Sequence, residues 1–332
     1  MVKYIVKRLL LSVFILFGVS LIIYFMIRLM PMNYIENKFA SLAGQGGLSK
    51  ERLHEIMVLY GLDDNSFGGI LKGYFSWLGK FITGDMGMSF KYGEKVEKII
   101  LENMGISFGI AFVSLIFELI IAIPLGIKCA VNQYGKLDYT ATVVAMTLTA
   151  FPAFFLGNIF IMLFADKLGW FDTTLGLHST GMDGASGWSY FIDMIWHLIL
   201  PMIVLVMLNV GSYMRYQRTN TLEVLNSDYI RTARAKGLSE GVVVYKHVFR
   251  NTMIPLVTVM ASTLPMLFGG AMITETVFEI DGIGRITYEA LKMGDIPLAM
   301  GYNMFIAILT VIGILLSDVM YAVVDPRVKL GR

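Results

Sequence analysis

Long apolar runs separated by polar segments dominate the chain. The first run extends from Leu9 to Ile27 and contains no charged residue. Five further apolar runs follow, at roughly 105–127, 139–165, 195–214, 253–274 and 302–324. An α-helix needs about 20 apolar residues to cross the hydrocarbon core of a bilayer. The pattern therefore predicts an all-α membrane protein with six transmembrane helices.

The charges between the runs predict how the chain is oriented. Lys3, Lys7 and Arg8 precede the first run, and the segment from Arg215 to Arg250 carries seven Lys/Arg and three acids. The segment 166–193 and the segment that follows the run 253–274 are acidic instead. Because basic loops stay on the cytoplasmic side, we expect both termini and the basic segment to lie in the cytoplasm.

The region from Met32 to about Glu102 contains no run long enough to span a membrane. We interpret it as a large external loop. An amphipathic helix that lies at the membrane interface is expected within it. The aromatic and aliphatic residues that suggest this helix are Tyr74, Phe75, Trp77, Leu78, Phe81 and Ile82.

Composition excludes several kinds of site. The chain is 56% hydrophobic and 16% charged, as integral membrane proteins are. Its one cysteine, Cys129, excludes an internal disulfide and a cysteine metal cluster. The sequence has no phosphate-binding G-x-x-x-x-G-K-[ST] loop and no readable Ser/His/Asp arrangement. The histidines show no metal-ligand spacing; they are His54, His178, His197 and His247. We therefore expect no enzyme activity, metal or cofactor on this chain.

The basic segment has its own helical pattern. Leu222, Leu225, Tyr229 and Ala233 recur at three- or four-residue spacing, which predicts an amphipathic helix over about 220–236. A basic segment of this kind beside a membrane can simply be attracted to anionic lipid. Composition alone supports this interpretation. Only the order of the residues can favour a more specific function for the segment.

Gly237 is expected to end this helix, because glycine readily adopts the left-handed conformation that closes a helical turn. Ser239 can then cap a second helix. Its expected apolar positions lead into the next apolar run, and they are Val242, Val243, Tyr245 and Phe249. The product is a helix, a glycine hinge and a second helix at the membrane surface.

The order of residues in the basic segment resembles a known motif. Residues 231–237 read R-T-A-R-A-K-G, and His247, Arg250, Asn251 and Pro255 follow. This is similar to the EAA loop of ABC importer permeases, in the form found in the dipeptide/oligopeptide/nickel permease family. In the general EAA pattern a Glu stands where this chain has Arg231, and Ile, Leu and Pro stand where it has His247, Phe249 and Arg250. At the positions where this chain departs from the general pattern, its residues resemble those of the peptide/nickel branch of the family.

Further phrases of that family are spread over nearly the whole chain. They are 28–31 (R-L-M-P), 84–89 (G-D-M-G-M-S), 197–201 (H-L-I-L-P), 275–278 (E-T-V-F), 282–284 (G-I-G), 318–321 (D-V-M-Y) and 325–327 (D-P-R). Asp281 stands where the family has Pro, and 32–34 read M-N-Y where it has G-D-P. Both departures fall on the expected external side, so they bear on the substrate more than on the mechanism.

The resemblance implies a type I ABC importer permease fold of the first-permease (B-type) subunit. It implies a cytoplasmic coupling helix between helices 4 and 5 that contacts an ATPase subunit. The coupling residues carried over from the motif are Tyr229, Arg231, Thr232, Ala233, Arg234, Ala235, Lys236, Gly237 and Leu238. On this basis the chain divides into 1–30 (N-terminus and first helix), 31–102 (external loop), 103–327 (core, with the coupling loop 217–251) and 328–332 (cytoplasmic tail).

The resemblance also implies an assembly in the inner (cytoplasmic) membrane. Its expected members are a second homologous permease, two ATPase subunits that hold ATP and Mg²⁺, and an extracytoplasmic solute-binding protein, with no nucleic acid. Six helices in one chain hardly enclose a peptide-sized path, which independently favours two permeases. Di- or oligopeptides are the expected substrates, and nickel and oligosaccharides are the alternatives.

Polar residues inside the apolar runs leave two interpretations open. Glu118 either lines the transport path or makes a structural hydrogen bond between helices, because a carboxylate in hydrocarbon needs water or a partner. Asn158 and Asn209 favour interhelical contacts. A secondary, ion-coupled carrier that uses Glu118 or Asp318 as its titrating group is the alternative of a different class.

Overall fold

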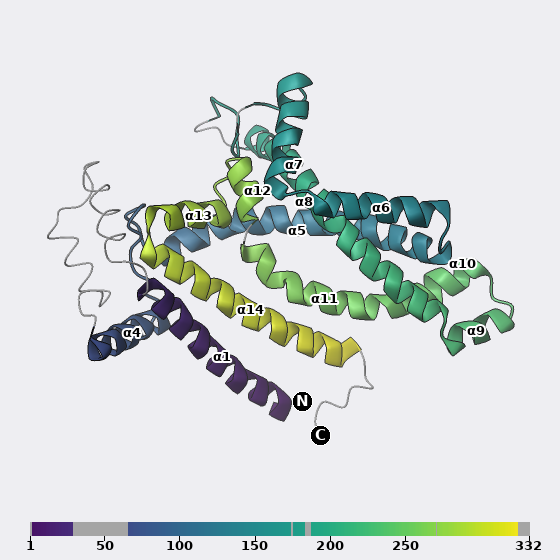
Figure 1. Cartoon of the computed structure of the whole chain (residues 1–332), viewed down its shortest axis with the longest axis horizontal. Helices are drawn as coiled ribbons and strands as arrows, with labels where there is room; N and C mark the ends of the chain where they lie inside the picture. Colours follow the sequence, from purple (N-terminus) through teal and green to yellow (C-terminus); the bar gives the residue numbers. More distant parts are fainter. Residues whose placement is uncertain (1, 29–65, 174, 183–186, 270, 325–332) are drawn as a thin grey trace. The chain divides into compact units, whose positions relative to one another are not determined.

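The computed structural model describes residues 2–28, 66–173, 175–182, 187–269 and 271–324. These residues form helices and connecting loops, with an isolated β-bridge between Met88 and Lys95 (Figure 1). Among them, four helices are long and apolar enough to cross a membrane. These helices are α1 (Val2–Arg28), α5 (Val96–Val131), α8 (Trp188–Leu225) and α14 (Ile296–Val324). The all-helical membrane class is confirmed, whereas the count of six spans stays a prediction.

The predicted run 139–165 forms a bent pair of helices instead of one straight span. α6 (Lys136–Ala150) and α7 (Ala153–Phe160), which continues as the π-helical segment η1 (Ile161–Lys167), meet at an angle of 99°. Phe151 and Pro152 between them are extended, with ψ of 135° and 137°. Proline forces the residue before it out of the helical region, so the bend follows from Pro152. Counted as one span, this pair is the fifth candidate.

The chain divides into two compact units. Unit 1 comprises Met1–Asn103 and Ile286–Val311, and unit 2 comprises Met104–Arg285 and Ile312–Arg332. The division expected at residues 31, 103 and 328 concerns the sides of a membrane and stays a prediction. The family phrases at 29–34 and 325–327, the tail 328–332 and the first part of the external loop to residue 65 lie outside the described residues.

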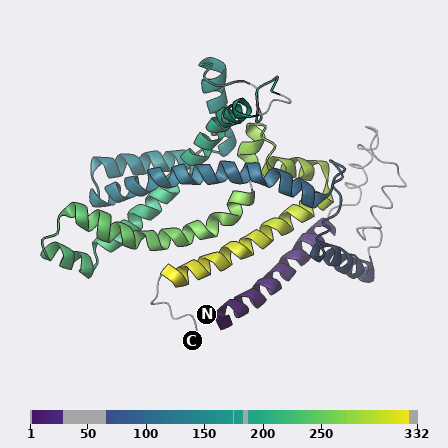
Figure 2. The same ribbon diagram turned by 180° about the vertical axis from the view of Figure 1, so that it is seen from behind.

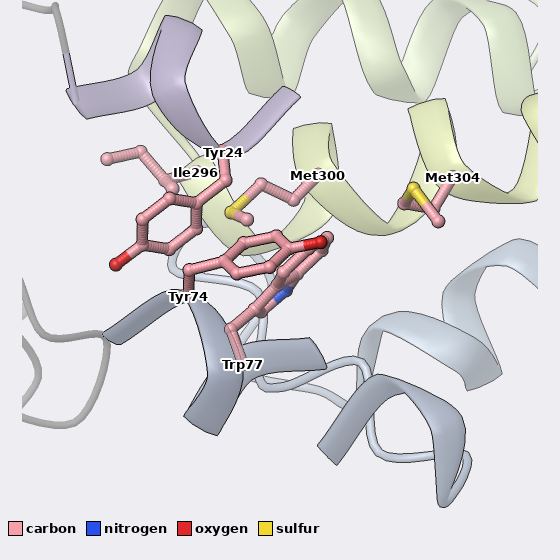
Figure 3. Packing of buried hydrophobic residues seen from close by; sticks show 6 residues of the cluster. All are labelled: Tyr24, Tyr74, Trp77, Ile296, Met300 and Met304. Atoms are coloured by element: carbon pink, nitrogen blue, oxygen red, sulfur yellow. The ribbon is translucent and has the colours of Figure 1, made fainter. Parts of the chain in front are cut away.

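An aromatic cluster forms the core of unit 1. It joins α1 to α4 (Phe67–Ile82) and to the start of α14. Its buried members are Tyr24, Tyr74, Trp77, Ile296, Met300 and Met304 (Figure 3). Ser66 caps α4, since its side chain accepts a hydrogen bond from the N–H of Gly69 at 3.0 Å.

The phrase at 84–89 leads to a second anchor in unit 1. Ser89 donates a hydrogen bond to the buried carboxylate of Asp295 at 2.5 Å, and the N–H of Lys91 donates to the same oxygen at 3.0 Å. The other oxygen of Asp295 accepts from the N–H of Leu298 at 3.2 Å, so Asp295 also caps α14. One buried carboxylate therefore fixes both the loop and the start of α14.

In unit 2, α8 packs closely on α6 and α5 at two glycines, one on α8 itself and one on α5. A Cβ on Gly211 would lie 2.9 Å from the carbonyl oxygen of Ala145 on α6, and one on Gly126 of α5 would lie 2.7 Å from that of Met214. The backbone at Ala145 and at Met214 cannot easily move away from such a Cβ. The two glycines therefore set how closely α8 approaches α6 and α5.

A buried carboxylate organises the segment after α11 (Phe249–Gly269). Glu275, in α12 (Met272–Val277), accepts hydrogen bonds from the hydroxyl of Ser107 at 2.7 Å and from the N–H groups of Ala271 and Arg285, both at 3.0 Å. Burial raises the pKa of Glu275, and these hydrogen bonds oppose the rise. A Cβ on Gly282 would lie 2.5 Å from both the Glu275 carboxylate and the Ser107 oxygen. The E-T-V-F and G-I-G phrases thus form one packed unit.

Candidate coupling site

The basic segment forms the tip of a helical hairpin in unit 2. α8 ends at Leu225, and α9 (Asp228–Ala235), α10 (Glu240–Val242) and the π-helical segment η2 (Val243–Val248) lead into α11. Both views show α9 and α10 at the end where α8 and α11 meet (Figures 1 and 2). We call residues 226–248 the hairpin tip.

The predicted continuous helix over 220–236 is wrong, because the chain breaks at Asn226 and Ser227. Ser227 is extended, with ψ of 151°, and its hydroxyl donates to the carbonyl oxygen of Val224 at 2.6 Å. Serine side chains readily bond to nearby backbone in this way and so favour helix ends. The break changes which side of the helix faces inward. Ile230 is fully buried, whereas Tyr229 is 47% exposed.

The hairpin tip has a small apolar core of its own. Ile230 and Ala233 of α9 pack with Val243 and Val248 of η2. Of the apolar positions expected in the second helix, Val243 is buried, as are Val244 and Val248, whereas Val242 and Tyr245 are exposed. The π-helical turn has more residues per turn, so it displaces the apolar positions from ordinary α-helical spacing. As a result α9 is held against the base of its own hairpin.

Gly237 provides the turn between the two helices, as predicted. Its φ is +78°, in the left-handed region that glycine adopts without strain. Its N–H donates to the carbonyl oxygen of Arg234 at 2.9 Å. A Cβ at this position would meet no other atom of the chain within 4 Å, so Gly237 borders open space. Ser239 takes the N-cap position of α10 without a side-chain cap bond.

Eight of the nine predicted coupling residues lie on the outer surface of the hairpin tip. They are Tyr229, Arg231, Thr232, Arg234, Ala235, Lys236, Gly237 and Leu238. Ala233 is the ninth, and it is 8% exposed within the apolar core. The small residues that a partner can approach closely are therefore Ala235 and Gly237, while Ala233 supports α9 from beneath.

Both arginines on this surface have acidic neighbours. Arg234 donates two hydrogen bonds to Glu240 across the glycine turn, at 2.7 and 3.1 Å. Arg231 lies 3.6 Å from Asp228. Both pairs are exposed to solvent, where such pairs contribute about 0–1 kcal/mol to stability. The arginines can therefore exchange these partners for an acidic surface at little cost.

The hairpin tip is joined to the rest of unit 2 by buried polar contacts near its base. Gln217 of α8 donates to the hydroxyl of Thr252 on α11 at 2.8 Å. Arg218 of α8 makes two hydrogen bonds to Asp138 of α6, at 2.5 and 2.7 Å. Gly126 brings α5 against the same part of α8. A displacement of the tip must therefore pass to α5, α6, α8 and α11.

The polar residues predicted inside the spans do not form one site. Asn209 of α8 donates to Glu118 of α5 at 3.1 Å and to the carbonyl oxygen of Leu205 at 3.0 Å. The Glu118 side chain is buried between these helices. Asn158 instead donates to the carbonyl oxygen of Phe154 in its own helix, at 2.7 Å, and is exposed. Glu118 therefore has a hydrogen-bond partner on a neighbouring helix, and both interpretations of its role stay predictions.

Sequence comparison identifies relatives along the whole chain. Residues 122–330 match the family described as binding-protein-dependent transport system inner membrane component. The oligopeptide transport system permease protein AppB of Bacillus subtilis (strain 168) is 34% identical over 330 residues, which is 99% of this chain and 100% of the relative. The dipeptide transport system permease protein DppB of Escherichia coli (strain K12) is 31% identical, over 99% of both chains.

A more distant relative and a solved structure extend the comparison. The peptidoglycan transport system permease protein YejB of Agrobacterium fabrum (strain C58) is 30% identical over 99% of this chain and 98% of the relative. A structure of the MetNI methionine ABC transporter in an inward-facing conformation superposes with a TM-score of 0.51 and 19% identity. It covers 68% of this chain and 96% of that chain, and the likeness concerns the fold.

Proposed function

The chain belongs to the family of binding-protein-dependent transport system inner membrane components, and from this premise we propose that it is a permease subunit of an ATP-driven ABC importer of peptides. The full-length relatives named for oligopeptide and dipeptide transport support this function. The chain contributes membrane-spanning helices, and ATP is hydrolysed on other subunits.

The observation that carries the proposal is the construction of the hairpin tip. Its outer surface offers Arg231, Arg234 and Lys236 beside the small residues Ala235 and Gly237. Its inner surface is held by a buried apolar core, and its base is joined to four helices. These features suit a coupling element. When a partner displaces the hairpin tip, the tip can move as a rigid body and transmit the displacement to the helices at its base.

The mechanism follows from these parts. Two ATPase subunits close on ATP and move the hairpin tip of this chain and that of a second, homologous permease. Because the tip is fixed to α5, α6, α8 and α11, the helices rock together from an inward-facing to an outward-facing arrangement. An extracytoplasmic binding protein then delivers the substrate. Both termini and the hairpin tip lie in the cytoplasm in this account.

The substrate is assigned at the level of its class. The relatives named for oligopeptide, dipeptide and peptidoglycan transport share a peptide component, which favours peptides over nickel or oligosaccharide. The departures at residues 32–34 and at Asp281 from the family pattern bear on this choice. The ligand of the binding protein that accompanies the chain would identify the substrate directly.

The proposal is tested by purifying the chain from its native membrane in mild detergent and identifying the accompanying proteins by mass spectrometry. We expect two ATP-binding subunits and a second permease, and ATP-dependent uptake after reconstitution with the binding protein. Recovery of the chain alone, with uptake driven by an ion gradient in the absence of ATP, would establish a secondary carrier instead.

A further inference from the structure

Helix α4 in unit 1 has two exposed faces of different chemistry. Phe67, Leu71, Phe75 and Ile82 recur at intervals of four and seven residues, so they form one stripe along the helix. Phe67 is 76%, Phe75 58% and Ile82 75% exposed. Tyr74 and Trp77 lie on the buried face of α4 (Figure 3). By helical spacing the stripe runs beside this face. Large apolar side chains gathered in this way indicate a surface that contacts something other than water.

The other exposed face of α4 is basic. Lys72, Ser76 and Lys80 follow each other at four-residue intervals and are exposed. No acidic residue is present in the helix. Lysine side chains can extend their charged ends toward phosphate groups while their stems lie on apolar surface. An apolar stripe beside a basic one is the pattern of a helix that lies in the surface of a membrane.

The contacts between α4 and α1 set the depth at which α4 lies. The hydroxyl of Tyr74 hydrogen-bonds Ser20 of α1 at 2.7 Å, and its ring packs on Phe17 and Tyr24 with centroids 6.1 and 5.5 Å away. The candidate span of α1 is Val6–Met26. Ser20 is therefore about 9 Å from the end of the span, at 1.5 Å per residue. Interfacial helices bury their apolar face about 5–10 Å into the boundary between headgroups and acyl chains, which is the same depth.

We propose that α4 is an interfacial helix that docks on the phospholipid bilayer at the end of α1 opposite the N-terminus. The stripe of Phe67, Leu71, Phe75 and Ile82 enters the acyl-chain region. Lys72 and Lys80 meet the phosphates of anionic lipids. The helix thereby fixes the height of the aromatic core of unit 1, and with it the start of α14, relative to the membrane surface. The inference depends on α1 spanning the membrane and is independent of the substrate.

The test compares two adjacent positions that are both exposed. Phe75→Cys and Ser76→Cys are made in a Cys129→Ala background, labelled with a nitroxide and placed in nanodiscs of phosphatidylcholine and phosphatidylglycerol. Collisions with oxygen report acyl chains, and collisions with a water-soluble nickel chelate report solvent. We expect position 75 to collide severalfold more with oxygen than with the chelate, and position 76 to show the reverse.

Two results would overturn the proposal. If both positions collide mainly with the nickel chelate, α4 stands in water. If position 75 is protected from both reagents, a protein covers the stripe instead of lipid. For the lysines, native mass spectrometry of the Lys72→Gln/Lys80→Gln variant should show less retained phosphatidylglycerol than a Lys95→Gln control, and equal retention would contradict their assignment to phosphates.

Discussion

Arg218 and Asp138 join α8 to α6 through two hydrogen bonds, from Nε to Oδ1 at 2.5 Å and from Nη2 to Oδ2 at 2.7 Å. The Asp138 side chain is almost fully buried, and it also accepts the N–H of Tyr134 at 2.9 Å. A planar guanidinium bound at both oxygens fixes orientation as well as distance. Near the base of the hairpin tip, α8 therefore cannot turn without moving α6.

Replacing Asp138 with Asn should weaken this connection. The variant keeps the size of the side chain but removes the charge that Arg218 binds, so we expect a loss of about 2–3 kcal/mol in stability, in the range for hydrogen bonds to charged groups. Thermal unfolding in detergent measures it. Asp166→Asn, at an exposed position, is the control and should be neutral. Equal stabilities of the two variants would show that the pair has no structural role.

Replacing Gly237 with Val should separate ATP hydrolysis from transport. A β-branched residue disfavours the left-handed conformation by about 1–2 kcal/mol, and its side chain would occupy the open space where the partner is expected. We expect the protein to insert normally and to lose most of its ATP-driven uptake. The control is Gly241→Val, since Gly241 is also exposed but lies in α10. Unchanged uptake in Gly237→Val would contradict the coupling role.

Reversing the charge of Arg234 should weaken binding of the ATPase subunit. The exposed pair with Glu240 contributes at most about 1 kcal/mol, so Arg234→Glu should change the melting temperature little. Co-purification of the ATPase should fall. The double variant Arg234→Glu/Glu240→Arg restores the pair within the chain but not a contact with a partner. Full recovery of co-purification in the double variant would show that Arg234 acts only within the hairpin tip.

Replacing Glu118 with Gln should leave ATP-driven uptake largely intact. Glutamine can still accept the hydrogen bond from Asn209, so the contact between α5 and α8 survives. Glu118→Ala removes it and should destabilise the protein by about 1–2 kcal/mol. Uptake in proteoliposomes and thermal unfolding distinguish the two effects. Abolished uptake in Glu118→Gln with normal stability would favour the ion-coupled carrier or a residue of the transport path.

Replacing Gly282 with Ala should destabilise unit 2. The new Cβ would lie 2.5 Å from the oxygen atoms of both Glu275 and Ser107, so the buried carboxylate would have to move. Overpacking of this kind costs about 1–3 kcal/mol. Gly105→Ala, two residues before Ser107 on α5 and without a close neighbour, is the control for thermal unfolding. If both variants melt together, the close contact at Gly282 is not required.

The features that sequence predicts well here depend on local physics. The length of an apolar run determines whether it can cross a bilayer, so α1, α5, α8 and α14 were accessible from composition. Gly237 was assigned correctly because the left-handed conformation is a property of glycine itself. Proline disfavours a helical residue before it, so local physics accounts for a bend at Pro152, but it does not determine the angle of 99°.

The features that sequence analysis missed depend on contacts between distant residues or on small changes of helical phase. The Ser227 break and the π-helical η2 each displace the apolar pattern, so Ile230 replaces Tyr229 inside the hairpin tip. Glu275 meets Ser107, 168 residues earlier, and Glu118 meets Asn209, 91 residues later. A periodicity argument contains no information about such pairs.

The central claim is that the outer surface of the hairpin tip contacts an ATP-binding subunit, and site-specific photo-cross-linking tests it most directly. A photoreactive amino acid is placed at Leu238, on that surface. As a control it is placed at Trp188, which is 74% exposed and begins α8, at the end of that helix away from the hairpin tip. After irradiation in native membranes, we expect Leu238 to capture an ATP-binding protein and Trp188 not to. Capture of no ATP-binding protein from Leu238, or equal capture from both positions, would contradict the account.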